Sequence, residues 1–93
     1  MSCRKKKALY YLQNFENFSI KIPWDCFEYI MTKLLGFEMT SGSGSERLFE
    51  CEGIKFTADE PHGKGDDFIW KDDRKRAINA IHRLKASRKD TGD

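Results

Sequence analysis

Residues 41–62, SGSGSERLFECEGIKFTADEPH, decide the fold that this sequence predicts. A run of serine and glycine is followed by two short segments in which apolar and polar residues alternate. Such alternation is typical of β-strands that have one buried face. The two segments meet at Glu52-Gly53, and glycine in a two-residue connection is typical of a tight hairpin. We therefore predict an antiparallel β-hairpin at the centre of the chain.

The two-residue turn also fixes which residues of the hairpin face each other. The core face should carry the pairs Arg47 and Ala58, Phe49 and Phe56, and Cys51 and Ile54. The other face should pair Glu50 with Lys55 and Leu48 with Thr57. The opposite charges of Glu50 and Lys55 favour this register by roughly a few tenths of a kcal/mol. Two turns remain open, a type I′ turn and a type I turn with a bulge at Gly53.

Helical patterns flank this region. Apolar residues recur at helical spacing in residues 4–15, in a segment opened by Pro23 and closed by Gly36, and in a segment that begins near Asp72 or Asp73. Residues 37–40 alternate and predict a further strand. We expect an α+β fold of order α-α-β-β-β-α, in which helices cover one face of a three-stranded antiparallel sheet. The chain then divides into a basic helix and linker (1–22), an αβββα domain (23–85) and a disordered tail (86–93).

The totals restrict the class of protein. Ninety-three residues, 39% of them apolar, suit one small domain. No run of about 18 apolar residues is present, and the N-terminus lacks the features of a signal peptide, so we expect no membrane span. Cys3, Cys26 and Cys51 are odd in number and widely spaced, which fits neither a disulfide framework nor a zinc site. We therefore expect reduced thiols and a cytoplasmic protein.

The net charge of +2 conceals an uneven distribution. Residues 4–7 and 74–89 hold eleven of the seventeen basic residues, and acidic residues gather between them, in 59–73. Such asymmetry suits a phosphate-binding surface at the two ends of the chain. Two solvated helices and a soluble tail would explain it equally well, because charge runs alone are weak evidence.

Residues 24–84 resemble the HicA-type mRNA interferase toxins of bacterial toxin–antitoxin systems. Leu34-Leu35-Gly36-Phe37 is similar to the family's LLxxxGF element, and residues 44–49, GSERLF, are similar to its Gly-Ser-His-His-x-Phe segment. Glu60-Pro61-His62 is similar to its Pro-His element. The resemblance implies a fold like that of double-stranded-RNA-binding domains, ribonuclease activity, and a bacterial or phage origin. It also implies a protein antitoxin as partner.

One departure from the family bears on catalysis. The position of the family's catalytic histidine is occupied by Glu46 and that of the neighbouring histidine by Arg47. Histidine suits proton transfer because its pKa lies near neutrality, whereas a surface glutamate is ionised at pH 7 and is a weaker base. The candidate catalytic residues are therefore His62 and Glu46, and whether the protein is an endoribonuclease stays open.

Other residues are candidates for binding. Contacts to nucleic acid are expected from Ser45, Arg47, Arg74, Lys75, Arg76 and Arg83. The loop also holds carboxylates and one imidazole that would suit magnesium or manganese, at Asp59, Glu60, His62, Asp66 and Asp67. A solvated acidic loop explains them more simply, so we expect no metal and no small-molecule cofactor. Tyr10, Tyr11, Trp24 and Trp70 are interpreted as packing residues rather than as a platform for stacking bases.

Two functions remain in view. The first is a HicA-like protein directed at RNA, either a toxin or a catalytically degenerate relative that acts by binding. The second is a non-catalytic regulator that binds protein or nucleic acid, for example an inhibitor of a host defence complex. The loss of the histidine pair favours the second. The expected partners are RNA or another nucleic acid, and a cognate antitoxin or another protein.

Overall fold

The computed structural model describes residues 3–61 and 67–91. The elements follow in the order α1 (Lys5–Gln13), α2 (Trp24–Tyr29), η1 (Ile30–Leu34), β1 (Glu38–Ser41), β2 (Glu46–Cys51), β3 (Ile54–Asp59) and α3 (Lys71–Thr91). The π-helical segment η1 continues α2, and Gly36, with φ of 84°, lies just beyond its end. This order confirms the predicted α+β arrangement of two helices, three strands and a helix.

The hairpin of β2 and β3 has the predicted register. Phe49 lies opposite Phe56, Cys51 opposite Ile54, and Glu50 opposite Lys55. Both turn residues have positive φ, 51° at Glu52 and 82° at Gly53. Positive φ at both central positions is the geometry of a type I′ turn, so the alternative with a bulge is not adopted.

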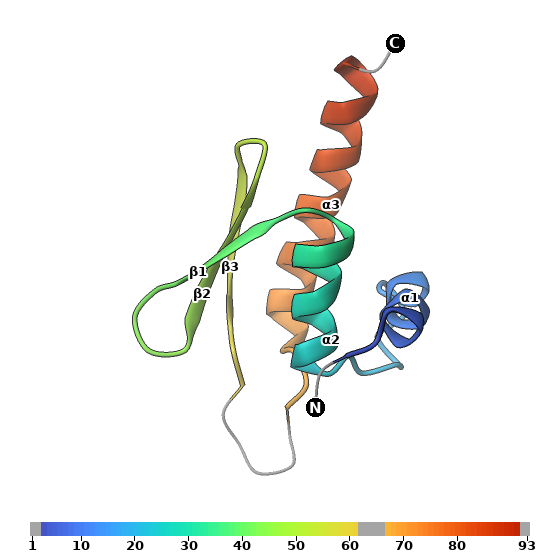
Figure 1. Cartoon of the computed structure of the whole chain (residues 1–93), viewed down its shortest axis with the longest axis vertical. Helices are drawn as coiled ribbons and strands as arrows, with labels where there is room; N and C mark the ends of the chain where they lie inside the picture. The colour runs from blue at the N-terminus through green and yellow to red at the C-terminus, as the bar shows by residue number, and fades with distance from the viewer. Residues whose placement is uncertain (1–2, 62–66, 92–93) are drawn as a thin grey trace.

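The sheet has the order β1-β2-β3, and helices cover one of its faces (Figure 1). The covered face includes Phe49 and Phe56, whose stacked rings have centroids 5.0 Å apart. Phe27 of α2 meets the Phe49 ring edge-on at 5.6 Å and is fully buried. These three rings form the centre of the core.

The opposite face of the sheet is left uncovered by the helices. The strand register gives three rows of neighbouring side chains on this face. They are Glu38, Glu50 and Lys55 in the first row, Thr40, Leu48 and Thr57 in the second, and Glu46 and Asp59 in the third. We call these eight residues the open sheet face. It carries four carboxylates and one ammonium group, so its charge is strongly negative.

Helix α3 is longer than the sequence predicts. It begins at Lys71 and continues to Thr91, so the expectation that residues 86–93 are disordered is wrong for 86–91. No glycine or proline interrupts this stretch, and Arg88 donates hydrogen bonds of 3.1 and 3.0 Å to the Glu52 carboxylate at the hairpin turn. Within the described part of the chain, no helix is both long and apolar enough to cross a membrane.

The N-terminal helix is attached to the rest of the protein by a disulfide. Cys3, just before α1, is bonded to Cys26 in α2, with 4.9 Å between the two Cα atoms. This corrects the expectation of reduced thiols at both positions. The pairing depends on α1 folding back against α2, which the spacing of cysteines does not reveal. Cys51 is free and buried on the covered face of the sheet, as expected of a packing residue.

Truncation of Phe49 tests the packing of the core. Phe49→Ala should lower the free energy of unfolding by about 3–5 kcal/mol, because it empties a fully buried aromatic site. The matched control is Leu48→Ala, the next residue on the same strand, which lies on the open sheet face and should cost clearly less. Chemical denaturation measures both values, and equal losses would contradict the register.

The disulfide should contribute measurably to stability. Replacing Cys3 and Cys26 by serine should lower the free energy of unfolding by about 2–4 kcal/mol, because the cross-link restricts the unfolded chain. Dithiothreitol should bring the wild type down to the stability of the double variant and leave that variant unchanged. A wild type equally stable with and without reductant would contradict this expectation.

Candidate nucleic-acid interface

Glu46 and Arg47, the two positions that the resemblance to HicA toxins pairs with histidines, lie at the start of β2. Glu46 is exposed on the open sheet face, where its register partner on β3 is Asp59. Its backbone closes the preceding loop, since the Gly42 N–H donates to the Glu46 carbonyl at 2.8 Å and the Glu46 N–H donates to the Ser43 carbonyl at 3.0 Å. Two carboxylate side chains thus lie opposite each other at this end of the hairpin.

Arg47 is engaged within the protein. Its guanidinium forms an ion pair of 3.0 Å with Glu60, and it donates at 3.0 Å to the carbonyls of Gly44 and Glu46. The Glu60 N–H in turn donates to the Ser45 carbonyl at 2.9 Å. The structure thus brings Ser45, Arg47 and Glu60 together, and the positive charge of Arg47 is neutralised there.

His62 and Asp66 lie outside the described residues, so the catalytic role of His62 and the metal-ligand alternative stay predictions. His82 lies on α3, exposed, with Nε2 3.0 Å from the Glu16 carboxylate. It belongs to a different part of the molecule from Glu46. Within residues 3–61 and 67–91, no histidine accompanies Glu46.

Arg74 is the largest departure from the expected interface. Only 3% of its surface is exposed, and its guanidinium donates to carbonyls of the segment that joins α1 to α2. The acceptors are Phe15 at 2.8 Å, Ile20 at 2.7 Å, Asn14 at 2.9 Å and Asn17 at 3.1 Å. Burial lowers the pKa of the guanidinium from its ordinary value, although an arginine stays protonated in proteins. Arg74 is therefore a structural cation, which corrects its assignment as a phosphate contact.

The remaining predicted cations lie on the surface of α3. Lys75 and Arg83 are exposed, and Arg76 is exposed but forms an ion pair with Asp73. Asp73 is itself buried and accepts a hydrogen bond of 3.0 Å from the Asp59 N–H at the end of β3. Arg76 thus supports the contact between helix and sheet, while Lys75 and Arg83 remain available to a ligand.

Further lysines extend this surface beyond the residues predicted from sequence. Each residue of an α-helix is rotated by about 100° around the helix axis from the one before it. The directions of three lysines of α3 around this axis therefore lie within roughly 40° of each other, those of Lys71, Lys75 and Lys89. We call these three residues the lysine stripe. All three are exposed, and none forms an ion pair with another described residue. The helical spacing of Lys71 and Lys89 relative to Lys75 was the signal for them in the sequence.

The fold separates the charges of the chain. Figure 1 shows α2 and α3 between the sheet on one side and α1 on the other. The exposed basic turn of α1, with Arg4 and Lys5 to Lys7, therefore lies on the side away from the open sheet face. The basic turn of α1 and the lysine stripe thus belong to the helical part of the molecule, and the open sheet face carries four carboxylates.

No family model, curated protein or solved structure matches the chain.

Replacement of Arg74 by lysine tests whether this arginine contributes more to stability than an arginine on the surface does. Arg74→Lys should lower the free energy of unfolding by about 2–4 kcal/mol, because an ammonium group cannot reach all four carbonyls that the guanidinium fork satisfies. The matched control is Arg83→Lys on the exposed side of the same helix, which should change stability by less than about 0.5 kcal/mol. Equally small losses in urea denaturation would show that the four hydrogen bonds carry little energy.

Proposed function

We propose that this is a HicA-like protein that acts by binding RNA through the exposed side of α3, without cleaving it. The observation that carries this proposal is the lysine stripe. Lys71 and Lys89 are 18 residues apart, which corresponds to about 27 Å along a helix. Three exposed ammonium groups over this length, none of them in an ion pair with another described residue, suit the phosphate backbone of a nucleic acid.

The positions equivalent to the family's catalytic pair support binding rather than catalysis. Proton transfer during RNA cleavage needs a group that can both accept and donate a proton near neutral pH. Glu46 faces Asp59 across the hairpin, and Arg47 is held by Glu60. Neither position carries a histidine, the side chain whose ordinary pKa lies near neutral pH, so we place the protein among the catalytically degenerate relatives.

A second candidate function rests on the open sheet face. This face holds four carboxylates, the half-buried Leu48, and a single ammonium group, that of Lys55. Such a surface repels nucleic acid and favours a protein with basic residues. A cognate antitoxin or a component of a host defence complex would bind here, on the side opposite the lysine stripe, so the two functions are compatible.

RNA is abundant in the cytoplasm, and we propose this location for the protein. The Cys3–Cys26 disulfide would be exposed to reducing conditions there. Buried residues of α1 and the following segment, including Ala8 and Phe15, would then keep the N-terminal region packed against the core.

A comparison of two charge reversals tests the proposal. Lys75→Glu and Lys55→Glu change the net charge equally, and both side chains are exposed. Lys75→Glu should weaken binding of a labelled single-stranded RNA about tenfold at low salt and reduce the dependence of binding on salt concentration, because it removes a phosphate contact. Lys55→Glu, on the open sheet face, should leave both quantities nearly unchanged.

The binding measurement also reports on cleavage. The wild type should retain the RNA intact, as judged by electrophoresis after the titration. Absence of RNA binding at low salt, or equal losses in the two variants, would overturn the proposed interface. Cleavage of the RNA by the wild type would overturn the assignment as a non-catalytic protein.

A further inference from the structure

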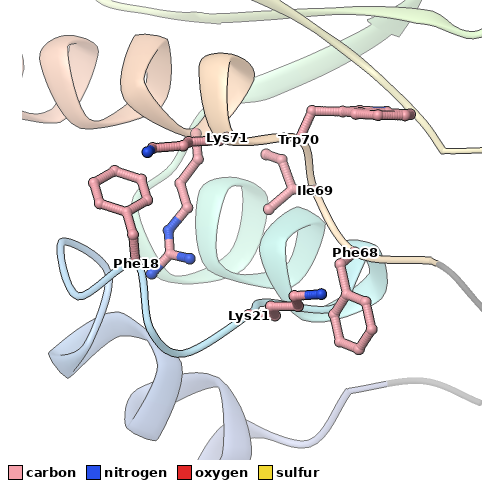
Figure 2. A pocket seen from close by; sticks show the side chains of 7 residues that line it. Phe18, Lys21, Phe68, Ile69, Trp70 and Lys71 are labelled. Atoms are coloured by element: carbon pink, nitrogen blue, oxygen red, sulfur yellow. The ribbon is translucent and has the colours of Figure 1, made fainter.

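A pocket of about 330 Å³ lies where the segment before α2 meets the start of α3 (Figure 2). Phe18 and Lys21 come from the first segment, and Phe68, Trp70 and Lys71 come from the residues that lead into α3. Figure 2 shows Phe18 beside Lys71 at one end, Phe68 beside Lys21 at another, and Ile69 between them. Phe18 and Lys21 precede the stretch that resembles HicA, so this pocket is not a feature of that resemblance.

Aromatic side chains at this pocket are unusually exposed. Trp70 is 61% exposed and Phe18 is 37% exposed, whereas the other tryptophan, Trp24, is 5% exposed. This corrects the interpretation of Trp70 as a packing residue. Exposed apolar surface that is contiguous and rimmed by polar groups marks interaction sites and ligand-binding grooves.

The position of Phe18 is fixed by the buried side chain of Arg74. The buried guanidinium of Arg74 lies 4.8 Å from the centre of the Phe18 ring, and the same guanidinium holds the carbonyls of Asn17 and Ile20 on either side of it. Binding therefore requires little ordering of this wall, which favours affinity.

The pocket is cationic as well as aromatic. The Lys21 ammonium lies 5.7 Å from the centre of the Phe68 ring, and the Lys71 ammonium lies 5.7 Å from that of Phe18. Neither lysine forms an ion pair with another described residue, and no acidic residue lines the pocket. Asp73, in the first turn of α3, is directed to the Asp59 N–H of the sheet instead.

We infer that this pocket binds one nucleotide, with its base stacked on Trp70 and its phosphate attracted by the positive charges of Lys21 and Lys71. Every base has a face that stacks on an aromatic ring, and lysine is a common phosphate ligand. Lys71 belongs both to the pocket and to the lysine stripe, so a strand bound along α3 would reach Trp70 at the start of the helix. The pocket assignment rests on the proposed function and extends it to an unpaired nucleotide of a single strand.

The two tryptophans allow a direct test by NMR, because Trp70 belongs to the site and the buried Trp24 does not. Trp70→Phe assigns the two indole N–H signals of the ¹⁵N-labelled protein. Titration with adenosine monophosphate, and separately with a six-nucleotide oligoadenylate, should shift the Trp70 indole signal in a saturable manner and leave that of Trp24 in place. Stronger binding of the oligonucleotide identifies a strand as the source of the nucleotide, and equal affinities identify the free nucleotide.

Variants separate the two parts of the site. Trp70→Ala should weaken binding of adenosine monophosphate about tenfold or more. The double replacement Lys21→Ala and Lys71→Ala should weaken binding of adenosine monophosphate. It should not weaken binding of adenosine, which lacks the phosphate. Lys55→Ala, on the open sheet face, is the control and should alter neither. Circular dichroism should show unchanged folding in every variant, because the four replaced side chains are all exposed.

The results distinguish a failure of the pocket assignment from a failure of the proposed RNA interface. RNA binding that depends on Lys75, combined with no Trp70 shift for either ligand, would overturn the pocket and leave the RNA interface. A saturable Trp70 shift in a protein that does not bind RNA through α3 would overturn the interface and support a site for free nucleotide. Shifts of both indole signals would overturn the assignment of the ligand to this pocket.

Discussion

The hydrogen bonds of the Arg74 guanidinium are the interaction on which the N-terminal third of the structure depends. Residues 14–20 form no helix or strand, and their turns provide local backbone donors for the carbonyls of Asn14 and Asn17 but for few others. A single buried guanidinium donates hydrogen bonds to four carbonyls of this segment and places one ring, Phe18, at the surface. The end of α1 and one wall of the pocket are thereby both set by one side chain of α3.

The basic residues of α3 have three different uses, although they look alike in the sequence. Arg74 is inside the protein. Arg76 pairs with Asp73 of the same helix, and Arg88 pairs with Glu52 at the hairpin turn of the sheet. The lysines and Arg83 face outward. The buried arginine thus lies where planar, multiple hydrogen bonds are needed, which accords with the chemistry of the guanidinium group.

The hairpin could be predicted from the sequence because its determinants are local. Two turn residues set the register, and alternation then assigned each side chain to a face. Arg74, the Cys3–Cys26 disulfide and the exposure of Trp70 could not be predicted, since each depends on segments that are distant in the chain. Of the cations that the sequence suggested for the interface, Lys75 and Arg83 are exposed and Arg74 is buried, a difference that helical spacing alone could not reveal.

The reach of Arg74 has a consequence for the order in which the chain acquires its structure during synthesis. Its acceptors precede it by 54 to 60 residues, so the segment after α1 leaves the ribosome long before its partner exists. Cys3 and Cys26, by contrast, are only 23 residues apart and can meet early. The hydrogen bonds between Arg74 and this segment can therefore form only after α3 has been synthesised.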